Sequence, residues 1–287
     1  MTWFAFSLLS ILVLALAELA QQYLLHTKKY FDERTSVVLT FLIQSILTIP
    51  IIFFSGLKAR VYTVFLLDTF PFILLVTLIS SFAMIFYLRS FKVNNISISS
   101  IFVSLSTVVS TSMGVVFFNE GIYLYKVLGI VLVLLAIISL NVKNLSLEKN
   151  HFYGLVAGAL FGIAYTLDKK IVQSVDPIIY IFWVFTLVAF FGFLFNPKAV
   201  IDMVKNARFE YYRPILISGI GYFLYNFFTF SAYKVGGEVG RVDAINNSQV
   251  FLIILVEYFI IRHKDNISRK LISAGIAFTG VMILGFL

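Results

Sequence analysis

The sequence predicts an all-α polytopic membrane protein whose ten transmembrane helices form two inverted five-helix repeats. The 287 residues are 60% hydrophobic and only 13% charged, whereas a soluble domain is about one quarter charged. Apolar runs of helical length follow one another along the chain, and the second half of the sequence resembles the first. The mean hydropathy of +0.98 agrees with a chain that lies almost entirely in a bilayer.

The apolar runs account for the expected number of helices. A membrane-spanning helix needs about 20 mostly apolar residues, and such runs are expected near residues 3–25, 36–55, 69–88, 96–118, 124–141, 152–170, 178–195, 213–233, 243–261 and 269–286. The connections are too short for a domain outside the membrane. The net charge of +8 comes from basic residues in or beside these connections, where they indicate lipid anchoring and topology rather than nucleic-acid binding.

Two pairs of segments resemble each other across the halves. SFKVNNISISS (90–100) resembles SAYKVGGEVGR (231–241), and NEGIYLYKVLGIVLVLLAIISL (119–140) resembles DNISRKLISAGIAFTGVMILGF (265–286). We therefore expect one five-helix repeat in residues 1–143, a linker at 144–150 and a second repeat in residues 151–287. An odd number of spans gives the repeats opposite orientations, which is the plan of many secondary transporters with a substrate site at the repeat interface.

Two motifs carry a family resemblance. The segments FFNEGIYLYKVLG (117–129) and DKKIVQSVDP (168–177), within a ten-helix plan, resemble the EamA type of the drug/metabolite transporter superfamily. RHKDN (262–266) departs from the pattern, because the family usually carries glycine and glutamate there. The resemblance covers essentially the whole chain and implies a multi-pass protein of the cell membrane that moves a small metabolite by alternating access. A lipid-linked-intermediate flippase or a non-transporting scaffold is the alternative.

Polar residues at membrane depth mark the expected substrate site, because an ionisable group that faces lipid is costly. The stretch at 236–257 carries four such residues on or near one helical face: Asp243, Asn246, Asn247 and Glu257. For Glu257 the alternative is an interfacial position where its carboxylate reaches water. For Asp243 it is a solvated cap shared with Glu238 and Arg241, which could also form a gate ion pair.

The remaining candidates lie on other spans, and together they predict a central cavity lined by the first, third, fourth, sixth, eighth and ninth spans. They are Glu18 and Gln22 on the first span, Ser104 and Thr107 on the fourth, Tyr165 on the sixth, and Tyr222 and Asn226 on the eighth. The hydroxyl face of the fourth span equally fits close helix packing, as do the glycines Gly154, Gly158, Gly162 and Gly275.

The candidate lining offers carboxylates, amides and tyrosines but few cations. An amino acid, a nucleobase-like compound or an organic cation therefore fits it better than a phosphorylated sugar, which needs arginine or lysine clamps. Lys169, Lys234 and Arg241 would overturn this expectation if their side chains converged on the cavity.

Catalysis is not expected. The sequence has no cysteine, no phosphate-binding loop, no metal-ligand spacing and no histidine beside a serine or carboxylate pattern. We expect no catalytic residue, cofactor, metal or nucleic-acid partner; the expected partners are the lipid bilayer, a small-molecule substrate and a coupling proton or sodium ion. The sequence does not decide between a monomer and a homodimer. It does not decide the orientation either: basic residues concentrate after odd-numbered spans, which places both termini outside, whereas the family resemblance places them inside.

Overall fold

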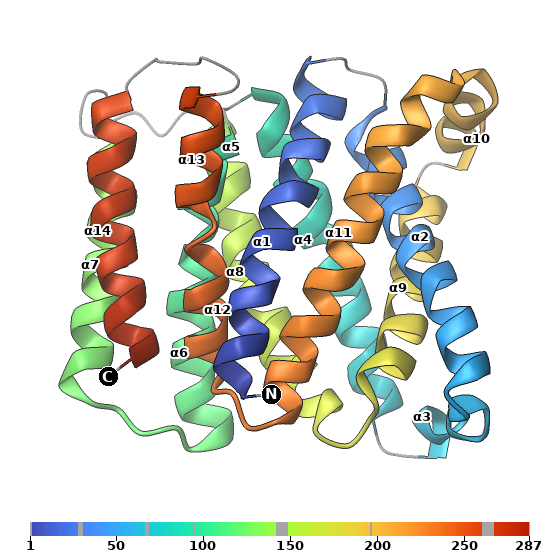
Figure 1. The fold of residues 1–287 in the computed structure, drawn as a ribbon, viewed down its shortest axis with the longest axis horizontal. Helices are drawn as coiled ribbons and strands as arrows, with labels where there is room; N and C mark the ends of the chain where they lie inside the picture. Colours follow the sequence, from blue (N-terminus) through green and yellow to red (C-terminus); the bar gives the residue numbers. More distant parts are fainter. Residues whose placement is uncertain are drawn as a thin grey trace.

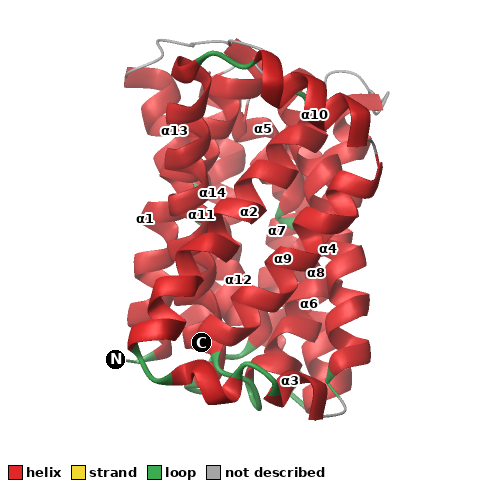
Figure 2. Ribbon diagram, turned by 90° about the vertical axis from the view of Figure 1, so that its right-hand side faces the viewer, coloured by secondary structure: helices red, strands yellow, loops and turns green. Residues whose placement is uncertain are grey.

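The computed structural model describes residues 2–27, 31–66, 69–93, 96–141, 149–195, 197–259 and 267–286. These residues form helices joined by short loops, and no strand occurs among them (Figures 1 and 2). Seven segments within these ranges are long and apolar enough to cross a membrane. The protein is therefore an all-helical, multi-pass membrane protein, and the count of ten spans stays a prediction.

The helices follow the expected order. The first half contains α1 (Trp3–Gln22), the π-helical turn η1 (Tyr23–Thr27), α2 (Glu33–Phe54), the 3-10 turn η2 (Leu57–Arg60), α3 (Thr63–Leu66), α4 (Phe70–Val93), α5 (Ile96–Val103), α6 (Leu105–Phe118) and α7 (Leu124–Asn141). The second half contains α8 (Lys149–Val172), α9 (Pro177–Phe195), α10 (Pro197–Asn206), α11 (Phe209–Lys234), α12 (Val239–Asn247), α13 (Val250–Phe259) and α14 (Ile267–Phe286).

Each expected span coincides with one helix or with two consecutive helices. The fourth span is divided into α5 and α6, and the ninth into α12 and α13. The connection expected before residue 213 contains the short helix α10. Of the expected linker at 144–150, residues 144–148 lie outside the described residues, and α8 already begins at Lys149.

The helices pack with their polar faces inward, as a bilayer requires. In α1, Leu8, Leu12 and Leu16 are 44%, 56% and 61% exposed at successive turns, whereas Ser10 and Glu18 on another face are buried. Lipid solvates apolar side chains but cannot form hydrogen bonds with polar ones. The amphipathicity of this helix is therefore reversed relative to a soluble protein, and its polar stripe points into the bundle.

Two helix pairs close the bundle at its ends. Helix α7 packs against α14 at one end of the long axis, and α2 packs against α9 at the other (Figure 1). Helices α1, α4, α8 and α11 and the divided spans α5–α6 and α12–α13 lie between these pairs. The chain begins and ends on the same side of the bundle, at the foot of α1 and of α14 (Figure 1).

A glycine face on α8 sets how closely it approaches α5 and α6. A Cβ atom added to Gly158 would lie 2.9 Å from the carbonyl oxygen of Val103, and one added to Gly162 would lie 2.8 Å from that of Ser106. The packing role expected for these glycines is confirmed. For Gly275, no atom of the described residues lies within 4 Å of an added Cβ atom, so its packing role stays a prediction.

This difference makes a matched pair of substitutions. We expect Gly162→Ala to lower the thermal unfolding temperature in detergent, because an added methyl group forces apart two closely packed helices, typically at a cost of about 1–3 kcal/mol. Gly275→Ala should leave that temperature unchanged or raise it, because alanine favours a helix over glycine. Equal loss of stability in both variants would contradict the packing role of the α8 glycines.

Candidate functional site

An internal cavity lies between the two halves of the chain. Side chains from α1, α4, α5, α8, α11 and α12 line it, and α2 and α9 add two phenylalanines that the sequence did not indicate, Phe41 and Phe185. The empty volume is about 700 Å³, but the centres of water molecules fit in only about 60 Å³ of it. The walls therefore stand close together and suit a small ligand.

Most of the residues predicted for a substrate site line this cavity: Glu18, Tyr165, Tyr222, Asn226, Asp243, Asn246 and Asn247. Gln22 is buried but does not line it, because one further turn of α1 moves it about 6 Å along the helix from Glu18. Ser104 donates to the carbonyl of Ser100 (3.2 Å), one turn back along its own span. Thr107 stands behind the lining and accepts from Asn247 (2.8 Å). The side chain of Glu257 lies outside the described residues.

Glu18 is the centre of the first polar cluster. Its carboxylate is 2% exposed and accepts hydrogen bonds from the phenol of Tyr87, from Ser100 (3.3 Å) and from the amide of Gln249 (2.8 Å). These donors come from α4, from α5 and from the turn between α12 and α13. The cluster therefore joins both halves of the chain around one acidic group.

Asp243 is the centre of the second cluster. It is also 2% exposed, and it accepts hydrogen bonds from Ser106 (2.8 Å), Ser110 (3.1 Å) and Asn247 (3.1 Å). The two serines belong to α6 in the first half and Asp243 to α12 in the second. The hydroxyl face predicted on the fourth span thus supplies donors to a buried carboxylate.

Both divided spans break beside these clusters. At Ser104, and again at Ser248 and Gln249, the chain leaves the α-helix and forms hydrogen bonds between residues three apart, such as Thr107 N–H to Ser104 C=O (3.1 Å) and Phe251 N–H to Ser248 C=O (3.1 Å). No glycine or proline marks either break. In membrane transporters such interrupted helices line substrate and ion sites.

The polar lining residues absent from the predicted site are Ser80, Tyr87, Asp168, Tyr225 and Gln249. Asp168 lies on α8, where Phe161, Tyr165 and Asp168 follow one another at helical spacing and all line the cavity. Its sequence neighbours Lys169 and Lys170 are basic residues beside a connection, a position that indicates lipid anchoring. The spacing from Tyr165 was the available signal for Asp168.

Aromatic rings form much of the remaining wall. The rings of Phe161 and Tyr165 lie parallel with their centroids 5.7 Å apart, and Tyr87 meets Phe161 edge-on at 5.7 Å. The hydroxyl of Tyr225 donates to that of Tyr165 (3.3 Å). The cavity thus combines acidic clusters with flat apolar surfaces.

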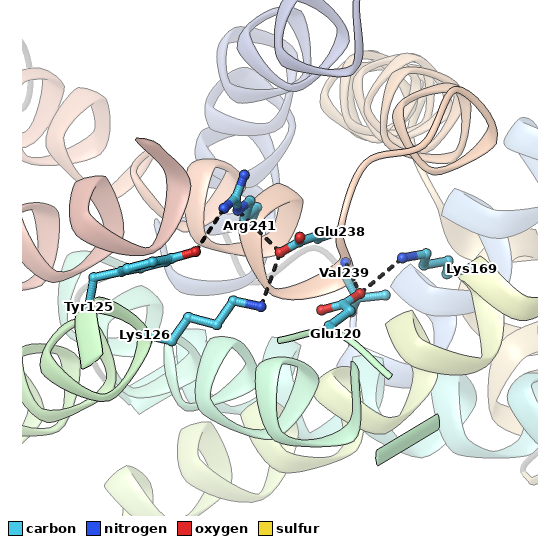
Figure 3. Close-up of polar contacts among 7 residues, drawn as sticks. All are labelled: Glu120, Tyr125, Lys126, Lys169, Glu238, Val239 and Arg241. Carbon is cyan, nitrogen blue, oxygen red and sulfur yellow. Dashed lines mark hydrogen bonds and ion pairs between the residues drawn. The ribbon is translucent and has the colours of Figure 1, made fainter. Parts of the chain in front are cut away.

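A network of ion pairs joins the halves on the side of the bundle where the termini lie (Figure 3). Glu120, in the loop after α6, pairs with Lys169 of α8 (3.0 Å) and accepts from the backbone N–H of Val239 (3.3 Å). Glu238, the N-cap of α12, pairs with Lys126 of α7 and with Arg241 (both 3.1 Å). Only one helical turn separates Val239 from Asp243, so the network closes the end of the cavity.

These contacts bear on two open expectations. Glu238 and Arg241 form an ion pair that fits both a cap at the start of α12 and a gate, whereas Asp243 lies in the cavity and not in this network. Lys169 and Arg241 are held by the network, and Lys234 donates to the carbonyl of Gln173 (2.8 Å). Within the described part of the chain, no lysine, arginine or histidine lines the cavity.

The sequence matches the EamA-like transporter family over residues 1–142 and again over residues 149–286. The chain belongs to this family. No curated protein matches the sequence of this EamA-like chain. One solved structure, described only as the crystal structure of a protein, superposes with a TM-score of 0.70 at 13% identity and covers 97% of this chain and 94% of its own. Identity this low supports the fold alone.

Within the ranges that the structure describes, histidine, aspartate and glutamate side chains form no group of three or more that could hold a metal ion. The buried carboxylates of this EamA-like protein accept hydrogen bonds from hydroxyl, phenol and amide groups instead.

The ion-pair network predicts an effect on access to the cavity. We expect Glu120→Gln to open this end more often, because Lys169 (8% side-chain exposure) would lose its anionic partner. The reporter is Thr111→Cys, a buried position on α6 next to Gly240, in a chain that has no other cysteine. Labelling of this cysteine by a hydrophilic maleimide should become faster.

The control is Glu210→Gln, which removes a surface ion pair with Arg208 of 4.0 Å whose side chains are 62% and 77% exposed. It should leave the labelling rate of Thr111→Cys unchanged. An unchanged rate in Glu120→Gln as well would show that the network does not hold this end shut.

Proposed function

We propose that this protein is a secondary transporter that moves a small metabolite across the cell membrane by alternating access. The observation that carries the proposal is the cavity, which both halves of the chain build from polar groups at membrane depth. Glu18 and Asp243 each accept hydrogen bonds from the opposite half. A relative movement of the halves would therefore rearrange the site itself.

The packing pattern supports an inverted-repeat arrangement, with residues 1–143 and 151–287 as the two units. Helix α1 packs against α11 as α8 packs against α4, and α12 contacts α1 as α5 contacts α8. Helices α2 and α9, which correspond to each other, form one pair, and α7 and α14 form the other. Exchanging the halves leaves these contacts unchanged, which is what a two-fold axis would produce.

The ion pairs supply a reason for two alternating states. Glu120 with Lys169 and Glu238 with Lys126 link the first half to the second on one side of the bundle. Opening the cavity toward that side requires these contacts to separate, and water entering the gap would then solvate the released charges. Closing them again would shut that side while the opposite one opens. This is the rocking movement of inverted-repeat carriers.

Energy for transport is proposed to come from an ion gradient. The sequence has no nucleotide-binding loop, so exchange or gradient coupling remains. Glu18 and Asp243 are buried, face the cavity and have no cation within salt-bridge distance in the described residues. Either carboxylate could take up a proton, or bind a sodium ion together with neighbouring hydroxyl oxygens, and Glu257 is the third carboxylate in the proposal.

Purified protein in liposomes tests both parts of this proposal. With an imposed pH or sodium gradient, wild-type protein should accumulate at least one member of a panel of labelled amino acids, nucleobases and amines. Glu18→Gln should abolish this accumulation and retain counterflow exchange, because glutamine keeps the volume and a hydrogen-bonding oxygen but cannot carry a proton. Glu210→Gln, an exposed control, should retain both activities.

Other outcomes have definite meanings. Loss of both activities together with a lower unfolding temperature in Glu18→Gln would assign Glu18 a packing role. Wild-type uptake that ignores both gradients would replace coupling by simple exchange. Movement of a fluorescent lipid, with no member of the panel transported, would favour the flippase instead of the metabolite transporter.

A further inference from the structure

The charge and the free hydrogen-bonding groups of the cavity narrow the class of ligand. We infer that the cavity binds an organic cation whose charged nitrogen lies against Asp168 and whose apolar body lies on Phe161 and Tyr165. The inference rests on the proposed function for its transport step but concerns binding alone. It selects one of the three ligand classes that the sequence left open.

Asp168 has a carboxylate oxygen that is free to accept a hydrogen bond from a cationic ligand. It is 5% exposed, lines the cavity and accepts a hydrogen bond from the phenol of Tyr180 on one oxygen. Among the described residues, no donor is assigned to its second oxygen and no cation pairs with it. Glu18 and Asp243 differ, because each already accepts three hydrogen bonds.

Two further groups in the wall are buried and unpartnered. The amide oxygen of Gln249 and the hydroxyl of Tyr222 have no hydrogen-bond partner within the described ranges, although these residues are only 4% and 5% exposed and line the cavity. A buried polar atom without a partner costs free energy. Each oxygen could accept an N–H of a ligand, so these positions point to a bound molecule.

A ligand carboxylate or phosphate would find few donors here. Four amide side chains line the cavity, and each already donates to a protein acceptor: Asn226, Asn246, Asn247 and Gln249. The nearby cations are occupied elsewhere, with Lys169 on Glu120 and Arg241 on Glu238. An amino acid would have to bury its carboxylate without a counter-ion, which a simple amine avoids.

The aromatic wall suits the rest of such a ligand. Phe161 and Tyr165 present stacked rings on the same face of α8 as Asp168. A cation near ring faces gains cation–π attraction, and an apolar body covers the rings. The small space between the walls favours a small aromatic or short aliphatic amine over a bulky one.

Three probes with one aromatic body separate the ligand classes: phenethylamine, phenylalanine and 2-phenylethanol. They carry an ammonium group, an ammonium group with a carboxylate, and a neutral hydroxyl. Because a ligand that binds only the folded state stabilises it, we expect phenethylamine to raise the unfolding temperature of the purified protein most. Stronger stabilisation by phenylalanine or 2-phenylethanol, or no stabilisation by phenethylamine and a set of aliphatic amines, would overturn the inference.

Variants of Asp168 test the contact directly. Asp168→Asn preserves shape and an acceptor for Tyr180, and it should weaken phenethylamine binding about 10- to 100-fold, as expected for the loss of a charge-assisted hydrogen bond. Tyr180→Phe should retain binding, because it frees the carboxylate oxygen that accepts from Tyr180 and keeps the charge. Asp202→Asn, at an exposed position on α10, is the control and should match wild type. Unchanged binding in Asp168→Asn would contradict the proposed contact.

Transport of the same probes distinguishes the two proposals. Binding of phenethylamine through Asp168 without passage across liposomes would support the inferred ligand class and contradict the proposed transport function. Uptake of phenylalanine or a neutral compound, with no binding of amines, would support the proposed transport function and contradict the inferred ligand class.

Discussion

The structure depends on satisfying buried carboxylates with neutral donors inside a bilayer. Lipid offers no hydrogen bonds, so polar groups at membrane depth need partners from the protein or from a bound ligand. Glu18 obtains its partners from Tyr87, Ser100 and Gln249, and Asp243 obtains two of its three from serines on α6. Because these donors lie on different helices and on both halves, the two acids hold the middle of the bundle together.

The breaks in the fourth and ninth spans follow from the same requirement. Gln249 can direct its amide toward Glu18 because the chain turns between α12 and α13. In the first half, Ser104 forms the corresponding break between α5 and α6. Outside this polar centre, the helices present leucine, isoleucine and phenylalanine to lipid. The cavity is therefore the one region of the described bundle where acids, amides and aromatic rings meet.

The fold was largely predictable from the sequence, because span length and apolar composition are local properties. The stripe that contains Asp243, Asn246 and Asn247 was also visible as helical spacing, and these residues do meet at the cavity. The breaks at Ser104 and Ser248 were not predictable, since neither position carries a glycine or proline.

Contacts between residues far apart in the sequence could not be predicted from helical spacing alone. Lys169 and Glu120 are 49 residues apart in sequence and meet only when α8 folds against the loop after α6. Without that contact, the sequence around Lys169 has the composition of an interfacial anchor and does not indicate that Asp168 beside it faces a cavity. Gln22 illustrates the opposite error: it shares a helical face with Glu18 but lies one turn beyond the cavity. Spacing identifies a face of a helix and does not indicate where along that face a cavity ends.

Accessibility of the cavity from both sides of the membrane tests the central claim most directly. Ser80 lines the cavity on α4, and Ser80→Cys introduces a single, nearly isosteric thiol into a chain without cysteine. Membrane-impermeant maleimides would be applied separately to each face, in right-side-out and inside-out vesicles. Alternating access predicts labelling from both faces, with faster labelling from one face accompanied by slower labelling from the other when a bound ligand shifts the equilibrium. Labelling from one face only, under every condition, would contradict the account.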